Sequence, residues 1–204
     1  MNPDARRQLI PRDDTLRLIG ALDGMKAKLL DAAHGWQLLD DTGHVPAAPV
    51  YADLLQHAAG AQTFAHGVIE LTADFARSPH STTRAGLAVL THLATAVTMS
   101  SNAAPHFAET AETALSLPRQ AGATDRHYQD NRMVIDHATG RAYLRRTSES
   151  LRDAATELNN HLDLHRFFPA PSAQQSPAPP APSPPSPPSP PSPPSPPGPS
   201  IRHC

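Results

Sequence analysis

Apolar residues recur at helical spacing along the first part of the chain. Between Asp13 and Leu39 they follow one another at steps of three and four residues, which predicts one helix with a single apolar stripe. The members of this stripe are Leu18, Leu22, Met25, Leu29, Ala32, Trp36 and Leu39. A short carboxylate accepts hydrogen bonds from the first turn of a helix, so Asp13 or Asp14 is the expected N-cap.

A second stripe predicts a helix over residues 48–77. Its members are Tyr51, Leu54, Ala58, Ala61, Ala65, Val68, Thr72 and Phe75. Pro79 follows shortly afterwards, and the residue before a proline avoids the helical conformation, so this helix should end by Ser78.

Residues 84–101 differ from both stripes, because nearly every position is apolar or small. A helix that is hydrophobic all round is usually buried, so this segment is the predicted central helix of a bundle. Ser81 or Thr82 is its expected N-cap. Pro105 suits the first turn of a helix and therefore predicts a restart, with a shorter helix over residues 105–117.

The segment before the last helix is open to two interpretations. Residues 133–144 contain two short runs of β-forming residues around Asp136-His-Ala-Thr-Gly140, a sequence typical of a turn, which favours a β-hairpin. The alternative is a helix that continues into the next one. A clear apolar stripe predicts that last helix from Thr147 or Ser148 to Phe168.

The predicted fold class is mainly α, a bundle of about five helices, with the small β-hairpin before the last helix left open. We expect a flexible N-terminal arm over residues 1–12, the bundle domain over residues 13–168 and a tail over residues 169–204. Of the 24 prolines, 17 fall in the last 36 residues, which have almost no apolar side chains to bury. Five Ser-Pro-Pro repeats there predict a disordered, polyproline-type tail that acts as a stiff spacer.

The charge balance and the cysteine content limit the function classes. Residues 1–168 contain 16 Lys and Arg against 19 Asp and Glu, whereas a nucleic-acid binder usually has a basic excess, so nucleic acid is an unexpected partner. Cys204 is the only cysteine, the N-terminus lacks the apolar run of a signal peptide, and no segment is suited to cross a membrane. We therefore expect a cytoplasmic protein, and the preference for Arg over Lys is typical of a bacterial, GC-rich genome.

Histidine is the only enriched reactive residue, with 12 copies. His161 and His165 are four residues apart on a predicted helix, and Glu157 lies one turn earlier on the same face. Two imidazoles at this spacing can share a metal ion, and the carboxylate would be a third ligand. The alternative is a solvated pair near a helix C-terminus, where positive charge is favourable.

Arg141, Arg145 and Arg146 form a local basic patch. If residues 132–146 are a hairpin, the arrangement resembles the wing of a winged-helix domain, and the arginines could follow a DNA phosphate backbone. Acidic residues are interleaved with them, so a solvated face of mixed charge is the alternative.

The sequence contains no Gly-x-Ser-x-Gly nucleophile motif, no phosphate loop and no dinucleotide-binding fingerprint. His57, His66 and His92 lie on or beside apolar stripes, which is typical of core or boundary histidines. The sequence therefore favours a non-enzymatic interaction or scaffold protein without a cofactor, whose partner is another protein or a second copy of itself. A DNA-binding regulator and a metal-binding helical bundle are the alternatives.

Overall fold

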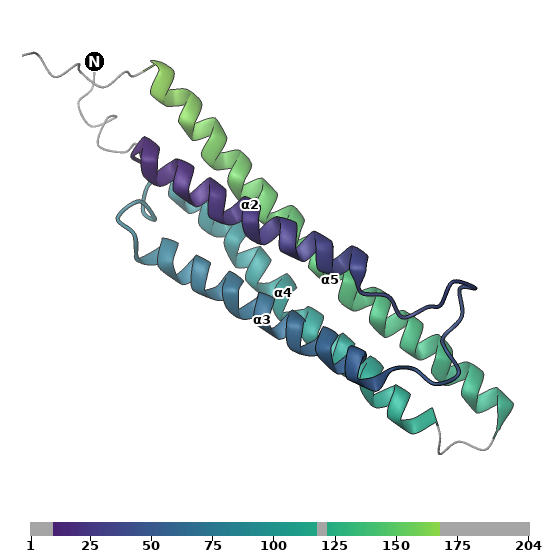
Figure 1. Cartoon of the computed structure of the whole chain (residues 1–204). Helices are drawn as coiled ribbons and strands as arrows, with labels where there is room; N and C mark the ends of the chain where they lie inside the picture. Colours follow the sequence, from purple (N-terminus) through teal and green to yellow (C-terminus); the bar gives the residue numbers. More distant parts are fainter. Residues whose placement is uncertain (1–9, 118–121, 168–204) are drawn as a thin grey trace, which may run out of the picture. The chain divides into compact units, whose positions relative to one another are not determined.

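The computed structural model describes residues 10–117 and 122–167, which form four α-helices that run side by side (Figure 1). α2 spans Arg12–Gly35, α3 spans Tyr51–Arg77, α4 spans Arg84–Ser116 and α5 spans Ala123–Phe167. Within these ranges there is no strand. The predicted mainly helical bundle is confirmed, but the predicted number of about five helices is wrong. Residues 1–9 of the predicted arm and the whole predicted tail lie outside the described residues.

The helices do not all pack against their neighbours in sequence. α4 packs along both α3 and α5, and α5 also packs along α2 (Figure 1). In contrast, α2 and α3 follow each other in the chain but make few contacts with each other. The first helix is therefore held mainly by the last one.

The predicted hairpin over residues 133–144 is wrong, because this segment belongs to α5, a continuous helix of 45 residues. The helical alternative is the correct interpretation. Polar residues and a glycine occupy several buried positions of this helix, so an apolar pattern does not reveal them. The buried positions in this region are Met133, His137, Gly140, Leu144, Thr147, Ser148 and Leu151.

The predicted restart of a helix at Pro105 is also wrong, because α4 continues through this residue. A proline inside a helix removes one backbone hydrogen bond, which favours a break. Here Ala103, Ala104 and Phe107 are buried on either side of the proline. Packing on both sides of the proline against the main core therefore keeps the helix continuous.

The helices begin at different residues from those predicted. α4 is capped by Thr83, whose hydroxyl oxygen accepts a hydrogen bond from the backbone N–H of Gly86 (3.0 Å). α2 follows Pro11, so two aspartates lie in its first turn, where the helix dipole favours negative charge. The predicted caps at Asp13 or Asp14, at Ser81 or Thr82, and at Thr147 or Ser148 are therefore wrong.

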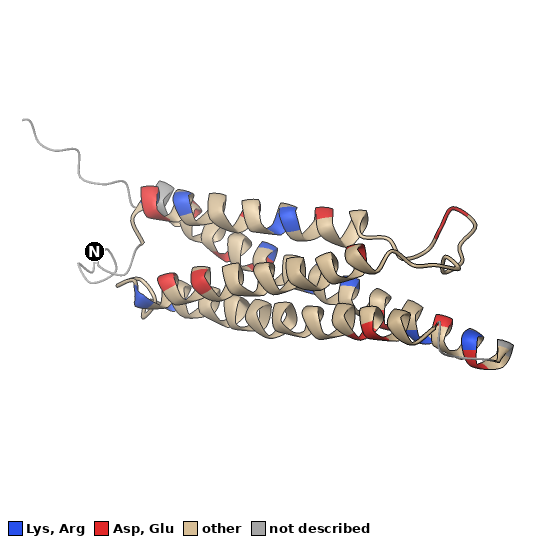
Figure 2. Ribbon diagram, turned by 60° about the horizontal axis from the view of Figure 1, so that its bottom comes forward, with Lys and Arg blue, Asp and Glu red and all other residues tan. Residues whose placement is uncertain are grey.

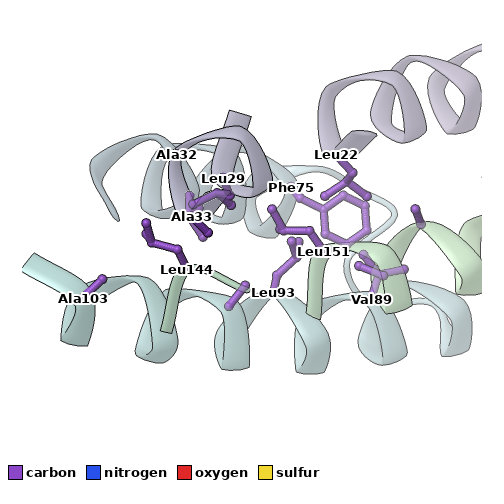
Figure 3. Close-up of a cluster of buried hydrophobic side chains, with 14 of the residues drawn as sticks. Leu22, Leu29, Ala32, Ala33, Phe75, Val89, Leu93, Ala103, Leu144 and Leu151 are labelled. Atoms are coloured by element: carbon purple, nitrogen blue, oxygen red, sulfur yellow. The ribbon is translucent and has the colours of Figure 1, made fainter. Parts of the chain in front are cut away.

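Leucines, alanines, two valines and two phenylalanines from the four helices make up most of the main core, part of which Figure 3 shows. The predicted all-round burial of residues 84–101 is wrong. Val89, Leu93 and Ala96 are fully buried, but Leu87 is 57% exposed. α4 therefore has an outer face that the described part of the bundle does not cover.

The connection between α2 and α3 turns at Asp40. The carboxylate of Asp40 accepts hydrogen bonds from the Thr42 hydroxyl and from the backbone N–H groups of His44 and Thr42. These bonds hold the pKa of Asp40 below its ordinary value. Leu39, which the stripe predicts to be buried, is 40% exposed because α2 has already ended at Gly35.

Candidate functional site

The outer face of α3 and α4 carries no Lys, Arg, Asp or Glu over most of its length. No such residue occurs between Asp53 and Glu70 on α3, or between Arg84 and Glu109 on α4. In Figure 2 the middle of these two helices is tan, while charged residues recur along α2 and α5. We call the exposed residues of these two segments the α3–α4 face. They are Leu55, Gln56, Ala59, Gln62, Thr63, His66 and Ile69 of α3, and Leu87, Thr91, Ala94, Thr95, Thr98, Ser101, Asn102, Pro105 and Ala108 of α4.

The threonines of the α3–α4 face are less polar than their side chains suggest. The hydroxyls of Thr91, Thr95 and Thr98 each donate a hydrogen bond to the backbone carbonyl four residues earlier. The hydroxyl of Thr63 on α3 does the same. A hydroxyl proton bonded within its own helix needs no acceptor from solvent. Covering this face with another surface would therefore leave none of these protons without a partner.

A cleft of about 530 Å³ lies between the start of α2 and the end of α3. Its position matches the few contacts between these two helices. Leu18, Leu71 and Phe75 contribute apolar lining, and Asp14 lies at the cleft with both an arginine and a histidine near it. Asp14 is thus already paired, and the lining favours no particular class of ligand.

Two histidines belong to an aromatic cluster within the bundle. The Trp36 ring stacks on His57, with ring centroids 4.9 Å apart, and meets the Phe107 ring edge-on at 5.2 Å. His137 also meets Phe107 edge-on, and its Nε2 lies 3.4 Å from Nδ1 of His57. His57 is half-buried, as expected for a boundary histidine, whereas His66 is exposed.

Burial lowers the pKa of both clustered histidines. Loss of solvation is the main cause for His137, and the nearby His57 and Arg141 add to it, which together lower its pKa to about 4. Burial likewise lowers the pKa of His57, with Asp53 opposing the shift and Arg141 adding to it. Both imidazoles are therefore neutral near pH 7 and pack as aromatic rings of the core.

A second group of titratable side chains lies where α4 meets α5. His106 and Glu109 are three residues apart on α4, and Asp136 approaches them from α5. Nδ1 of His106 lies 3.8 Å from Oε2 of Glu109 and 3.8 Å from Oδ1 of Asp136. All three residues are half-buried, and one potential ligand atom from each lies within 4.8 Å of the others. In the described part of the chain, this is the group of three that could hold a metal ion.

The predicted metal ligands lie elsewhere, near the C-terminal end of α5. His161 is buried, and its Nε2 accepts a hydrogen bond from the backbone N–H of Ile10 (2.9 Å). Glu157 is half-buried on the same helix, and the side chain of His165 lies outside the described residues. One ring nitrogen of His161 is thus engaged in joining Ile10 to α5, and a metal site formed by these three residues stays a prediction.

The three arginines of the predicted basic patch do not lie on a wing. All three belong to α5, so the winged-helix premise of the DNA-binding hypothesis is wrong. Arg141 donates hydrogen bonds to the Ala33 carbonyl (2.6 Å) and to the Gln37 side chain (3.3 Å). Burial, with the nearby Arg145, lowers the pKa of Arg141. Arg141 therefore joins α5 to the end of α2, while Arg145 is half-buried and Arg146 is exposed.

Sequence reasoning missed the group formed by His106, Glu109 and Asp136. One signal was present, because a histidine and a glutamate three residues apart lie on the same side of a helix. Asp136, however, cannot be connected to this pair as long as residues 133–144 are interpreted as a hairpin. Only the pairing of α4 with α5 brings the third side chain to the other two.

No family model matches the chain, and neither a search of curated proteins nor a search of solved structures finds a match. Among the described residues, no helix has an apolar stretch long enough to span a bilayer.

Proposed function

We propose that the protein is a non-enzymatic interaction module that associates with a second copy of itself through the α3–α4 face. The observation that supports this is the lack of Lys, Arg, Asp and Glu over residues 54–69 of α3 and residues 85–108 of α4, two adjacent helices. A solvated helix usually has a charged outer face, whereas charged residues are depleted at the centre of protein interfaces.

Three exposed apolar side chains would contribute most to such an interface. Leu55, Ile69 and Leu87 are each about half exposed, so burying one of them contributes on the order of 1 kcal/mol. In a two-fold dimer each residue contributes twice, which gives roughly 6 kcal/mol from these side chains. Association costs at least about 4 kcal/mol in lost freedom, so we expect a weak, concentration-dependent dimer.

The size and the composition of the face favour a second copy as the partner. Two helices about 10 Å wide, over about 30 Å of length, present on the order of 600 Å², close to the ~800 Å² per partner of a standard interface. A second copy presents the same surface and brings no unpaired charge into the contact. A charged partner would have to leave its own charges unpaired against this face.

Light scattering of the full chain over a hundredfold range of concentration tests the proposal. The mass should rise from 21.8 kDa toward twice that value. Leu87→Glu should shift this rise to higher concentration or abolish it, because each dimer would bury two new carboxylates. Ile135→Glu is the matched control, because Ile135 is 64% exposed but lies on the charged helix α5. Circular dichroism checks that each variant keeps its helices.

Two results would contradict the proposal. One is a monomeric mass at every concentration. The other is a dimer that Ile135→Glu disrupts while Leu87→Glu leaves it intact, which would move the interface to α5.

A further inference from the structure

We propose that His106, Glu109 and Asp136 form a binding site for one divalent first-row transition-metal ion that joins α4 to α5. Nδ1 of His106 lies 3.8 Å from one carboxylate oxygen of each acidic residue. Ligands about 2.1 Å from a tetrahedral metal ion lie about 3.4 Å from one another. The two distances from His106 therefore need to shorten by only about 0.4 Å, and the three potential ligand atoms all lie within 4.8 Å of one another.

Two atoms of this group are buried without a hydrogen-bond partner. They are Nδ1 of His106 and Oδ2 of Asp136. Buried polar atoms are nearly always hydrogen-bonded, and one explanation for an exception is an ion that completes the site. A cation between the two helices would give Nδ1 of His106 a partner, and it would also give Oδ2 of Asp136 one when this carboxylate binds the ion through both of its oxygens.

The packing of α4 and α5 holds the ligands near their positions. The Tyr143 ring of α5 stacks on the His106 ring, with centroids 5.5 Å apart and planes inclined by 14°. Phe107 and His137, the residues next to two of the ligands, are buried and contact each other edge-on. The backbones that carry His106 and Asp136 are therefore fixed by the core, which lowers the entropy lost when an ion binds.

One imidazole and two carboxylates select the class of ion. Ca²⁺ and Mg²⁺ prefer sites made of oxygen ligands, whereas imidazole suits Zn²⁺ and the other late first-row ions. The two carboxylates neutralise the charge of a divalent ion. Three protein ligands leave a coordination position for water or a further ligand, as in zinc sites that are open to solvent.

Arg132 is the cation that competes with a metal ion at this site. Its Nε lies 3.7 Å from Oδ2 of Asp136, which is too far for a hydrogen bond, and its side chain is 54% exposed. The guanidinium can therefore move into solvent when a metal ion binds. Removing its charge should tighten metal binding, by about tenfold at low ionic strength for charges separated by roughly 6 Å in water.

Calorimetric titration of the metal-free full chain with Zn²⁺ tests the site, in a Cys204→Ser background that removes the only thiol. We expect one Zn²⁺ per chain, and at least on the order of 100-fold weaker binding for Asp136→Asn and for Glu109→Gln. Glu112→Gln is the matched control, because Glu112 is an exposed glutamate on the same helix, and it should bind like the parent. Arg132→Gln should bind more tightly. Visible absorption of bound Co²⁺ gives an independent readout of the coordination.

Absence of Zn²⁺ uptake would overturn the proposal, and so would tight uptake that survives both Asp136→Asn and Glu109→Gln. Uptake that is lost in His161→Ala but kept in Asp136→Asn would assign the ion to the predicted group near His161 instead. Glu109 is half-exposed, so Glu109→Gln should stay folded and decide the question even if Asp136→Asn does not.

Discussion

Replacing Gly140 by alanine has two opposing effects on stability, and their balance depends on how closely α4 and α5 approach each other. In a helix interior, alanine is more favourable than glycine by about 1 kcal/mol. A Cβ atom at position 140, however, would lie 2.9, 3.0 and 3.1 Å from three ring carbons of Phe107. That ring is buried and has edge-on contacts with Trp36 and His137, so it has little room to move aside.

The size of the net effect follows from these two terms. Over-packing a core typically costs 1–3 kcal/mol. With the helix term subtracted, Gly140→Ala should lower the free energy of unfolding by up to about 2 kcal/mol. Gly24→Ala in α2 is the matched control, because no heavy atom lies within 4 Å of the added Cβ. It should raise the free energy of unfolding by about 0.5–1 kcal/mol.

Urea unfolding followed by far-ultraviolet circular dichroism measures the free energy of unfolding of both variants. In thermal unfolding, each kcal/mol of this free energy should shift the Tm by about 2–4 °C. The combination of Gly140→Ala with Phe107→Leu tests the cause. In the Phe107→Leu background, the alanine should become neutral or stabilising, because the ring it contacts is gone. If Gly140→Ala stabilised the parent as much as Gly24→Ala does, the close approach of α4 and α5 at Phe107 would be refuted.

Two further predictions concern protonation and helix capping. Burial lowers the pKa of His137 from 6.5 to about 4, so the unfolded chain takes up a proton before the folded one does. The free energy of unfolding should therefore fall by up to about 3 kcal/mol as the pH decreases from 7 to 4. Urea unfolding at several pH values should show that this free energy depends less on pH in His137→Gln than in the parent. An equal pH dependence of the two proteins would contradict this. Thr83→Ala should lower the Tm, because it removes an N-cap hydrogen bond that contributes about 1 kcal/mol. Thr82→Ala should leave the Tm unchanged. Equal effects of the two substitutions on the Tm would place the cap elsewhere.

The helices that could be predicted from the sequence are those with regular apolar stripes. α3 runs within a few residues of its predicted range, because Leu54, Ala61 and Val68 mark its buried face directly. Over residues 133–144, the sequence could offer helix only as an alternative to the hairpin, because His137 and Gly140 occupy positions of the buried face of α5. Histidine and glycine are acceptable there only because aromatic rings from other helices surround them, and that information is not local to the segment.

The candidate metal site was beyond sequence reasoning for a similar reason. His106 and Glu109 could be placed on one helix face, but Asp136 is 27 positions further along than Glu109. Its place beside them depends on the register between α4 and α5, which the contact of Phe107 with Gly140 helps to set. Local spacing instead drew attention to His161 and His165, a pair that requires only one helix to be recognised.

The hydrogen bond between Ile10 and His161 joins residues 151 positions apart, while α2 makes few contacts with the helix that follows it. Closing a loop of that length costs on the order of 4 kcal/mol of chain entropy, against about 2 kcal/mol for the short connection between α3 and α4. α3, α4 and α5 can pair through neighbouring segments, but α2 has to find a helix at the far end of the domain. The contact order of the bundle is therefore dominated by one helix, and its folding rate should reflect the docking of α2 rather than the formation of any single helix.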